Sequence, residues 1–154
     1  MRKINTITLA IAASVLFAAC SKKDSSTPSA APSIIGNWQF SDFTEDTSMG
    51  NNPAMDLWAI ATPCSKDNLW EFKTGGVFVL DEGATKCSAS DDQSTAETWK
   101  QTDTKTLVIG TTNPLTATIL TLDDSTLKLS FNGYHFRGYQ DSIPAIETIT
   151  FKRQ

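Results

Sequence analysis

Hydrophobic and polar residues alternate with a period of two along most of the chain after residue 34. Between residues 34 and 43, Gly36, Trp38 and Phe40 fall on one face, and polar residues fall on the other. Such alternation is typical of a β-strand that has one buried face. The pattern therefore predicts a first strand whose Trp38 and Phe40 point into the core.

Short alternating segments, separated by turn residues, continue to the C-terminus. Trp70 and Phe72 share a face just before Gly75 and Gly76, and glycine supplies the positive φ that a tight hairpin turn requires. Trp99 lies at the centre of a later segment. The further predicted strands are residues 77–80, 96–101, 106–110, 115–122, 126–132 and 146–152.

The alternation breaks between residues 44 and 63. The sequence Asn-Asn-Pro at 51–53 offers an N-cap and a proline at the first helical position, so we predict about two turns of helix over residues 54–60. The apolar residues of this segment, Trp58 among them, must pack on another part of the domain. Such a segment either closes one end of the core or forms a lid over a binding cavity.

About eight strands with regularly spaced turns and at most one short helix predict an all-β domain over residues 34–154. Closing the strands into an up-and-down antiparallel barrel removes their exposed edges, so we expect that architecture. A barrel of this size encloses space for side chains or for one small ligand. A β-sandwich is the alternative fold.

The N-terminal residues differ in composition from the predicted strands. Arg2 and Lys3 precede a run of small and apolar residues from 7 to 19. This run is shorter than the roughly 20 apolar residues that span a bilayer, so we expect residues 1–19 to be a secretory signal peptide. Residues 20–33 are rich in Ser, Pro and Ala and are expected to form a flexible tether.

The sequence Leu-Phe-Ala-Ala-Cys at 16–20 resembles the lipobox of bacterial lipoproteins. The resemblance implies cleavage before Cys20 and attachment of an acyl chain such as palmitate to that cysteine, which would anchor the protein to a membrane. We therefore expect a lipoprotein of the cell envelope, attached to the outer membrane on its periplasmic or its surface face. A secreted protein cut near Ala19 is the alternative.

The charge of the chain narrows the range of partners. The formal net charge is −4, and it becomes more negative when Arg2 and Lys3 are removed with the signal peptide. Nucleic-acid binding requires clustered lysine and arginine, which a mildly acidic domain does not offer. We therefore expect no nucleic-acid partner.

With Cys20 acylated, two cysteines are left. In an oxidising envelope compartment, Cys64 and Cys87 are expected to form a disulfide. A free pair of thiols and a metal site are the alternatives. A metal site would need more ligands than the single histidine, His135, brings from a distant part of the sequence.

Catalytic motifs are absent from the sequence. It contains no Gly-x-Ser-x-Gly, no helix with paired histidines and no glycine-rich phosphate loop. Paired acids at 81–82, 91–92 and 123–124 fall in predicted turns, where aspartate is favoured for backbone reasons. We therefore expect a protein that is not an enzyme and that holds no cofactor and no metal.

Two sets of residues are candidates for binding. Aromatic side chains on the predicted inward faces either line an apolar cavity or fill a small barrel; they are Trp38, Phe40, Trp70, Phe72 and Trp99. Residues 134–139 mix aromatic and basic side chains, as contact surfaces do; they include Tyr134, His135, Arg137 and Tyr139. This second segment is either a lid or contact loop, like the segment around Trp58, or an extension of the flanking hairpin.

Gly36-Asn37-Trp38 at the start of the first strand resembles the Gly-x-Trp signature of lipocalins. Cys64 and Cys87, which bracket the strand-turn-strand segment, resemble those of lipocalin-like lipoproteins of Bacteroidota over residues 34–152. The resemblance implies a barrel in which Trp38 plugs the closed end. It also implies that a basic residue at the end of the last strand, Lys152 or Arg153, packs on the tryptophan as a cation–π partner.

We therefore expect a membrane-anchored barrel that binds a small apolar or amphipathic ligand. The alternative is a module that contacts another envelope protein, as a hydrolase inhibitor or an accessory subunit, and whose barrel is completely filled. The size of the void inside the barrel distinguishes the two, because ligand pockets begin at about 300 Å³.

Overall fold

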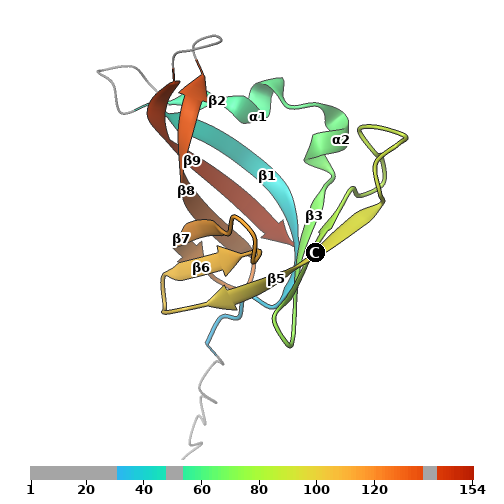
Figure 1. Ribbon diagram of the computed structural model, residues 1–154, viewed down its shortest axis with the longest axis vertical. Coiled ribbons are helices and arrows are strands. Elements are labelled where there is room, and N and C mark those ends of the chain that lie inside the picture. Colours follow the sequence, from blue (N-terminus) through green and yellow to red (C-terminus); the bar gives the residue numbers. More distant parts are fainter. Residues whose placement is uncertain (1–30, 48–53, 137–141) are drawn as a thin grey trace, which may run out of the picture. The chain divides into compact units, whose positions relative to one another are not determined.

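A computed structural model describes residues 31–47, 54–136 and 142–154 (Figure 1). The predicted signal peptide at residues 1–19, Cys20, Arg137 and Tyr139 lie outside the described residues. The elements are β1 Gly36–Asp46, β2 Met55–Asp56, α1 Leu57–Ile60, α2 Pro63–Lys66, β3 Leu69–Lys73, β4 Val77–Asp81, β5 Ser94–Gln101, β6 Thr106–Ile109, β7 Leu115–Leu122, β8 Thr126–Phe136 and β9 Ser142–Arg153.

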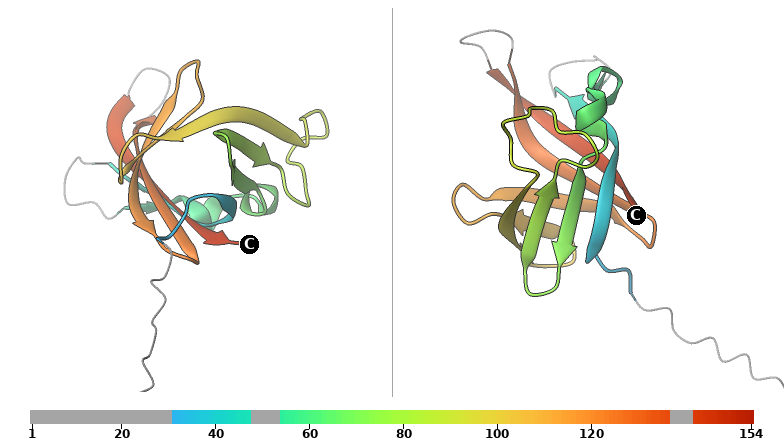
Figure 2. Two further views of the ribbon diagram at one scale, coloured as in Figure 1. Left: turned by 90° about the horizontal axis from the view of Figure 1, so that it is seen from below. Right: turned by 90° about the vertical axis from the view of Figure 1, so that its right-hand side faces the viewer.

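Eight strands close into one antiparallel barrel, as predicted, and the sandwich is excluded. From β3 onwards each strand pairs with its successor, and β1 pairs with β3 on one side and with β9 on the other. The β1–β9 ladder runs from the pair Trp38 and Arg153 to the pair Asp46 and Ile146. The short strand β2 extends the β3 side of β1 towards its far end. Figure 2 shows the strands curving round to meet.

The β3–β4 hairpin forms as its sequence predicts. Gly75 and Gly76 adopt φ angles of +79° and +77°, which residues with a Cβ rarely adopt. The resulting register pairs Phe72 with Phe78, and both side chains are buried. The glycine turn and the alternation of buried side chains therefore specify the same pairing of β3 with β4.

Aromatic side chains fill the middle of the barrel. Trp70 contacts five phenylalanine rings from four other strands and its own, at centroid distances from 4.9 to 6.4 Å. The largest side chains with almost no solvent exposure are Trp38, Phe72, Phe151, Leu107, Leu127 and Leu129. Because these rings and aliphatic groups pack directly on one another, the centre of the barrel is a solid core.

Trp38 closes one end of the barrel, where β1 begins. Its side chain is fully buried, and its indole Nε1–H donates to the carbonyl of Ile34 at 2.7 Å. The guanidinium of Arg153 lies 4.1 Å from the centre of its ring. The predicted cation–π partner is therefore Arg153, while the ammonium of Lys152 donates to the hydroxyl of Thr126 instead.

Arg153 also fastens the chain on both sides of this plug. Its three donor nitrogens reach three backbone carbonyls, at 2.6, 2.9 and 2.8 Å; these belong to Ser33, Ile35 and Asp124. Gly36 makes room for this arrangement, because a Cβ at that position would collide with Nη1 of Arg153. Gly36 also has a φ of +145°, which favours glycine.

The segment between β1 and β3 differs from its prediction. It contains two one-turn helices, α1 and α2, where we expected a single helix over residues 54–60. Met55 and Asp56 are extended because they pair with the edge of β1, so α1 begins only at Leu57. The carboxylate of Asp56 then accepts the N–H of Ala59 as the N-cap. The expected cap at 51–53 lies outside the described residues.

The β8–β9 hairpin is longer than predicted at the end where β8 leads into β9. Pairing continues through Tyr134 with Pro144 and His135 with Ile143, although we expected strands only over 126–132 and 146–152. A proline inside a segment argues against a strand, and this concealed the start of β9. Tyr134 and His135 therefore extend the hairpin, which is the second of the two alternatives for this segment.

Candidate functional site

An apolar pocket opens between α1 and the inner face of β1. Figure 1 shows α1 near the top of the view. Its volume is about 340 Å³. The lining residues are Phe40, Phe43, Leu57, Trp58, Ile60, Ala61 and Ser65. Only Ser65 contributes a polar side chain, so the pocket offers dispersion contacts and almost no hydrogen bonds. We call it the α1 pocket.

A β-bulge in β1 builds the floor of this pocket. The register shifts between Phe40 and Asp42, so that Phe40 pairs with Phe151 and Phe43 with Ile149. The extra residue, Ser41, donates its hydroxyl to the carbonyl of Thr150 at 3.0 Å. Because the bulge changes the alternation by one residue, both phenylalanines face inwards.

The helix α1 covers the floor. Trp58 lines the pocket from this side, and the ammonium of Lys66 lies 4.9 Å from the centre of its ring. Ile60 also lines the pocket, yet its side chain is 75% exposed. An isoleucine this exposed gains little from folding.

A disulfide fastens the C-terminal side of this cover. Cys64 in α2 is bonded to Cys87 in the loop after β4, which confirms the predicted bridge. With its nitrogen oriented towards two carbonyls, the amide of Asn68 also bridges Cys64 at 2.9 Å and Glu82 at 3.1 Å. Covalent and hydrogen bonds together therefore hold α2 against the β4 loop.

Other hollows on the described surface have similar volumes, from about 300 to about 380 Å³. Their linings include backbone and side chains of threonine, lysine and glycine residues. None of them combines an aromatic floor with a helical cover, so the α1 pocket is the best candidate for an apolar ligand.

The five aromatic candidates from the sequence fall into two groups. Trp38, Trp70 and Phe72 belong to the packed core and do not line the α1 pocket, whereas Phe40 belongs to both. Sequence reasoning missed Phe43, because uninterrupted alternation from Trp38 and Phe40 would direct it outwards. A bulge leaves no signal in the sequence that would have corrected this.

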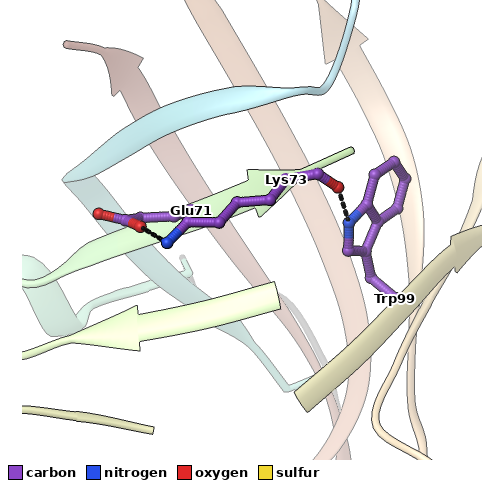
Figure 3. Close-up of polar contacts among 3 residues, drawn as sticks. All are labelled: Glu71, Lys73 and Trp99. Carbon is purple, nitrogen blue, oxygen red and sulfur yellow. Dashed lines mark hydrogen bonds and ion pairs between the residues drawn. The ribbon is translucent and has the colours of Figure 1, made fainter. Parts of the chain in front are cut away.

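Trp99 connects strands rather than lining the α1 pocket (Figure 3). Its indole Nε1–H donates to the carbonyl of Lys73 at 3.0 Å, and its ring meets Phe72 edge to face at 5.4 Å. The ammonium of Lys73 pairs with Glu71 at 2.8 Å. The half-buried Trp99 thus attaches β5 to the end of the β3–β4 hairpin.

Three titratable side chains meet on the inward faces of β1, β8 and β9. Glu45 follows Phe43 on the inner face of β1, and only 6% of it is exposed. Its Oε1 lies 2.6 Å from Nδ1 of His135. Glu147 lies directly opposite Glu45 in the β1–β9 ladder. Burial, and then the charge of Glu45, raise the pKa of Glu147 above its ordinary value. We call Glu45, Glu147 and His135 the acid–histidine cluster.

Small residues make space for these carboxylates. A Cβ on Gly133 would lie only 2.7 Å from Oε1 of Glu147, and the neighbouring position on β9 is Ala145. Within the described ranges, no three His, Cys, Asp or Glu side chains are placed to share a metal ion. His135 therefore contacts a buried carboxylate inside the barrel, which the sequence did not reveal. Tyr134 beside it is 61% exposed.

A family model described as a lipocalin-like domain matches residues 34–129, which is more than half of the chain. The match begins just before β1 and ends within β8. No curated protein matches the chain. Among the helices that the structure describes, none is long and apolar enough to cross a membrane.

Proposed function

Because the chain belongs to the lipocalin-like domain family, we propose that it is a binding protein and not an enzyme, and that it holds one small apolar or amphipathic molecule in the α1 pocket. The observation that carries this proposal is the pocket itself, with an aromatic floor, an apolar helical cover and a volume of about 340 Å³. Ligand pockets span roughly 300 to 1,000 Å³, so the ligand is a small one.

The packed core supports this position for the ligand. Trp70 and its phenylalanine neighbours occupy the middle of the barrel, so a ligand cannot enter there without displacing rings. The α1 pocket needs no such rearrangement.

Binding to the pocket can be tested with N-phenyl-1-naphthylamine, an uncharged fluorophore whose emission rises in apolar surroundings. Fluorescence titration of the full chain should give a saturable curve of one site. Replacing Ile60 by lysine should weaken binding roughly tenfold, because the exposed side chain contacts ligand but little else. The proposal fails if the parent protein does not bind the fluorophore.

A matched control separates the pocket from general surface hydrophobicity. Leu120 on β7 is 52% exposed and lies in a different hollow. Replacing Leu120 by lysine adds the same charge and removes a similar side chain, so affinity should not change. Equal losses in the two variants would mean that the fluorophore binds non-specifically.

The envelope location belongs to the same proposal. We propose that the chain is exported, acylated at Cys20 and anchored to the outer membrane through the tether at 20–33. The lipobox resemblance and the Cys64–Cys87 disulfide support it, since disulfides persist in oxidising compartments. Replacing Cys20 by serine should release the protein from the membrane fraction and prevent incorporation of an alkyne-labelled palmitate.

Two observations favour a second function, contact with another envelope protein such as a hydrolase inhibited or assisted by this chain. The first is the packed centre of the barrel, because this alternative predicts a filled barrel. The second is the outer face of the β8–β9 hairpin, where Tyr134 and Ile146 are 61% and 43% exposed and flank Pro144. Capture of one defined partner that is lost on replacing both residues by serine, but kept on replacing Ile60 by lysine, would favour this function over ligand binding.

A further inference from the structure

Two like charges face each other inside the barrel near the α1 pocket. Glu45 and Glu147 are directly opposite in the β1–β9 ladder, where carboxylates that are both ionised repel each other. His135 contacts Glu45 at 2.6 Å and, when protonated, neutralises one of the two charges. The net charge of the cluster therefore depends on pH.

The surrounding elements bring no further charge to this cluster. Among the described residues, the only other titratable side chain at an inward position of β1, β8 or β9 is Arg153, which packs on Trp38 at the opposite end of the β1–β9 ladder. The carboxylate of Asp56 on β2 caps α1 by accepting the N–H of Ala59, and α1 itself has no charged residue. Repulsion between Glu45 and Glu147 is therefore opposed within this part of the chain only by His135.

The end of β1 that carries Glu45 also positions α1. Glu45 pairs with Met55, and Thr44 pairs with Asp56, which makes up the whole of β2. Leu57, the first residue of α1 and a lining residue of the pocket, follows β2 directly. Any movement of this end of β1 away from β9 is therefore transmitted through two residue pairs to the cover of the pocket.

We propose that the acid–histidine cluster is a pH-sensitive latch that fixes α1 over the pocket. When Glu147 is protonated, Glu45 and His135 remain as a neutral ion pair and the end of β1 is held against β9. When Glu147 is ionised, the carboxylates repel and α1 opens more often. The role of the latch in ligand access rests on the proposed function.

The direction of the response follows from linkage. Burial and the charge of Glu45 raise the pKa of Glu147 above its ordinary value of 4.5. A carboxyl whose pKa is raised by folding binds more protons in the folded state, so its protonated form favours the closed structure. The closed arrangement is therefore most favoured below about pH 4.5 and weakens as the pH rises through the raised pKa.

Hydrogen exchange measured by mass spectrometry on the full chain tests the latch without any ligand. The readout is the protection factor of peptides covering residues 54–62, corrected for the intrinsic pH dependence of exchange. In the parent protein it should fall roughly fivefold between pH 4.5 and pH 8, the effect expected of one like-charge cross-strand pair. In the Glu147→Gln variant it should stay high and independent of pH.

Three further variants make this test specific. Replacing His135 by glutamine removes the group that pairs with Glu45 and should lower protection once Glu147 is ionised. The Glu97→Gln variant alters an exposed glutamate on β5 and should retain the parent's pH dependence. If Glu147→Gln fails to fold, Glu45→Gln removes the repulsion but leaves Glu147 buried, so protection should fall less with rising pH than it does in the parent.

The outcomes distinguish the latch from the binding function. Protection of residues 54–62 that does not change with pH, or a Glu147→Gln variant that keeps the parent's response, overturns the latch. If protection responds as expected but N-phenyl-1-naphthylamine binds at no pH, the latch is upheld and the proposed function fails. If both hold, the affinity for the fluorophore should follow the protection factor.

Discussion

Replacing Arg153 by alanine is expected to lower the free energy of unfolding by about 3 kcal/mol. The guanidinium donates three hydrogen bonds to backbone carbonyls, of Ser33, Ile35 and Asp124, and lies 4.1 Å from the ring centre of Trp38. Because the side chain is only half-buried, each hydrogen bond contributes about 0.5–1 kcal/mol net. The cation–π contact adds about 0.5–1 kcal/mol.

Lysine at this position separates charge from geometry. Its ammonium keeps the positive charge over Trp38. It cannot donate to all three carbonyls, because these are arranged around the plane of a guanidinium. The Arg153→Lys variant should therefore lose about two of the three hydrogen bonds, or about 1.5 kcal/mol. Stability between that of the parent and that of the alanine variant is the signature of a geometric contribution.

Urea unfolding followed by tryptophan fluorescence measures these differences. The neighbouring basic residue provides the control, since Lys152 is exposed and its ammonium makes one hydrogen bond to the described residues, with the hydroxyl of Thr126. Replacing Lys152 by alanine should change stability by less than about 0.5 kcal/mol. If Arg153→Lys is as stable as the parent, or if both alanine variants lose the same amount, Arg153 does not fasten the closed end as inferred.

Two other predictions concern the disulfide and the dependence of the free energy of unfolding on pH in acid. Replacing Cys64 and Cys87 together by serine should lower the free energy of unfolding by about 3 kcal/mol, because the bridge joins residues with a sequence separation of 23. Equal melting temperatures of the variant and the parent would contradict this. The Asp123 carboxylate accepts the N–H groups of Ser125 and Thr126, and these bonds lower its pKa below 3.8. Its stabilisation is therefore present above pH 3.8 and lost as the pH falls through the lowered pKa. Urea unfolding from pH 2 to 7 should show the parent and Asp123→Ala converging at low pH, whereas a constant difference would exclude this cause.

Local signals account for the parts of the fold that the sequence predicts. The β3–β4 hairpin has both alternation and a Gly75-Gly76 turn, and β7 is observed at the predicted residues 115–122. The pairing of Trp38 with a basic residue was implied by resemblance, but the choice of Arg153 over Lys152 depends on strand geometry. Each of these features can be predicted from residues that are close together in the sequence, or from one partner that its residue type identifies.

The site was harder to predict because it depends on contacts between distant segments. The bulge at Ser41 turns Phe43 and Glu45 inwards, and strict alternation from Trp38 assigns them to the opposite face. The strand β2 exists because an edge of β1 is free to pair with it, and α1 is shortened as a result. Trp58 could be predicted as part of a cover, whereas the meeting of Glu45, Glu147 and His135 requires the register of three strands.

The ladder between the first and last strands has a consequence for the kinetics of folding. A bond such as that from Ser41 to Thr150 spans 109 residues, whereas the hairpins of the meander join near neighbours. Pairs this far apart form slowly, because the entropy of closing a long loop opposes them. We expect the hairpins to appear early and the ladder to close last. Until then β1 and β9 both present unpaired edges, so the half-folded chain is the species most exposed to aggregation.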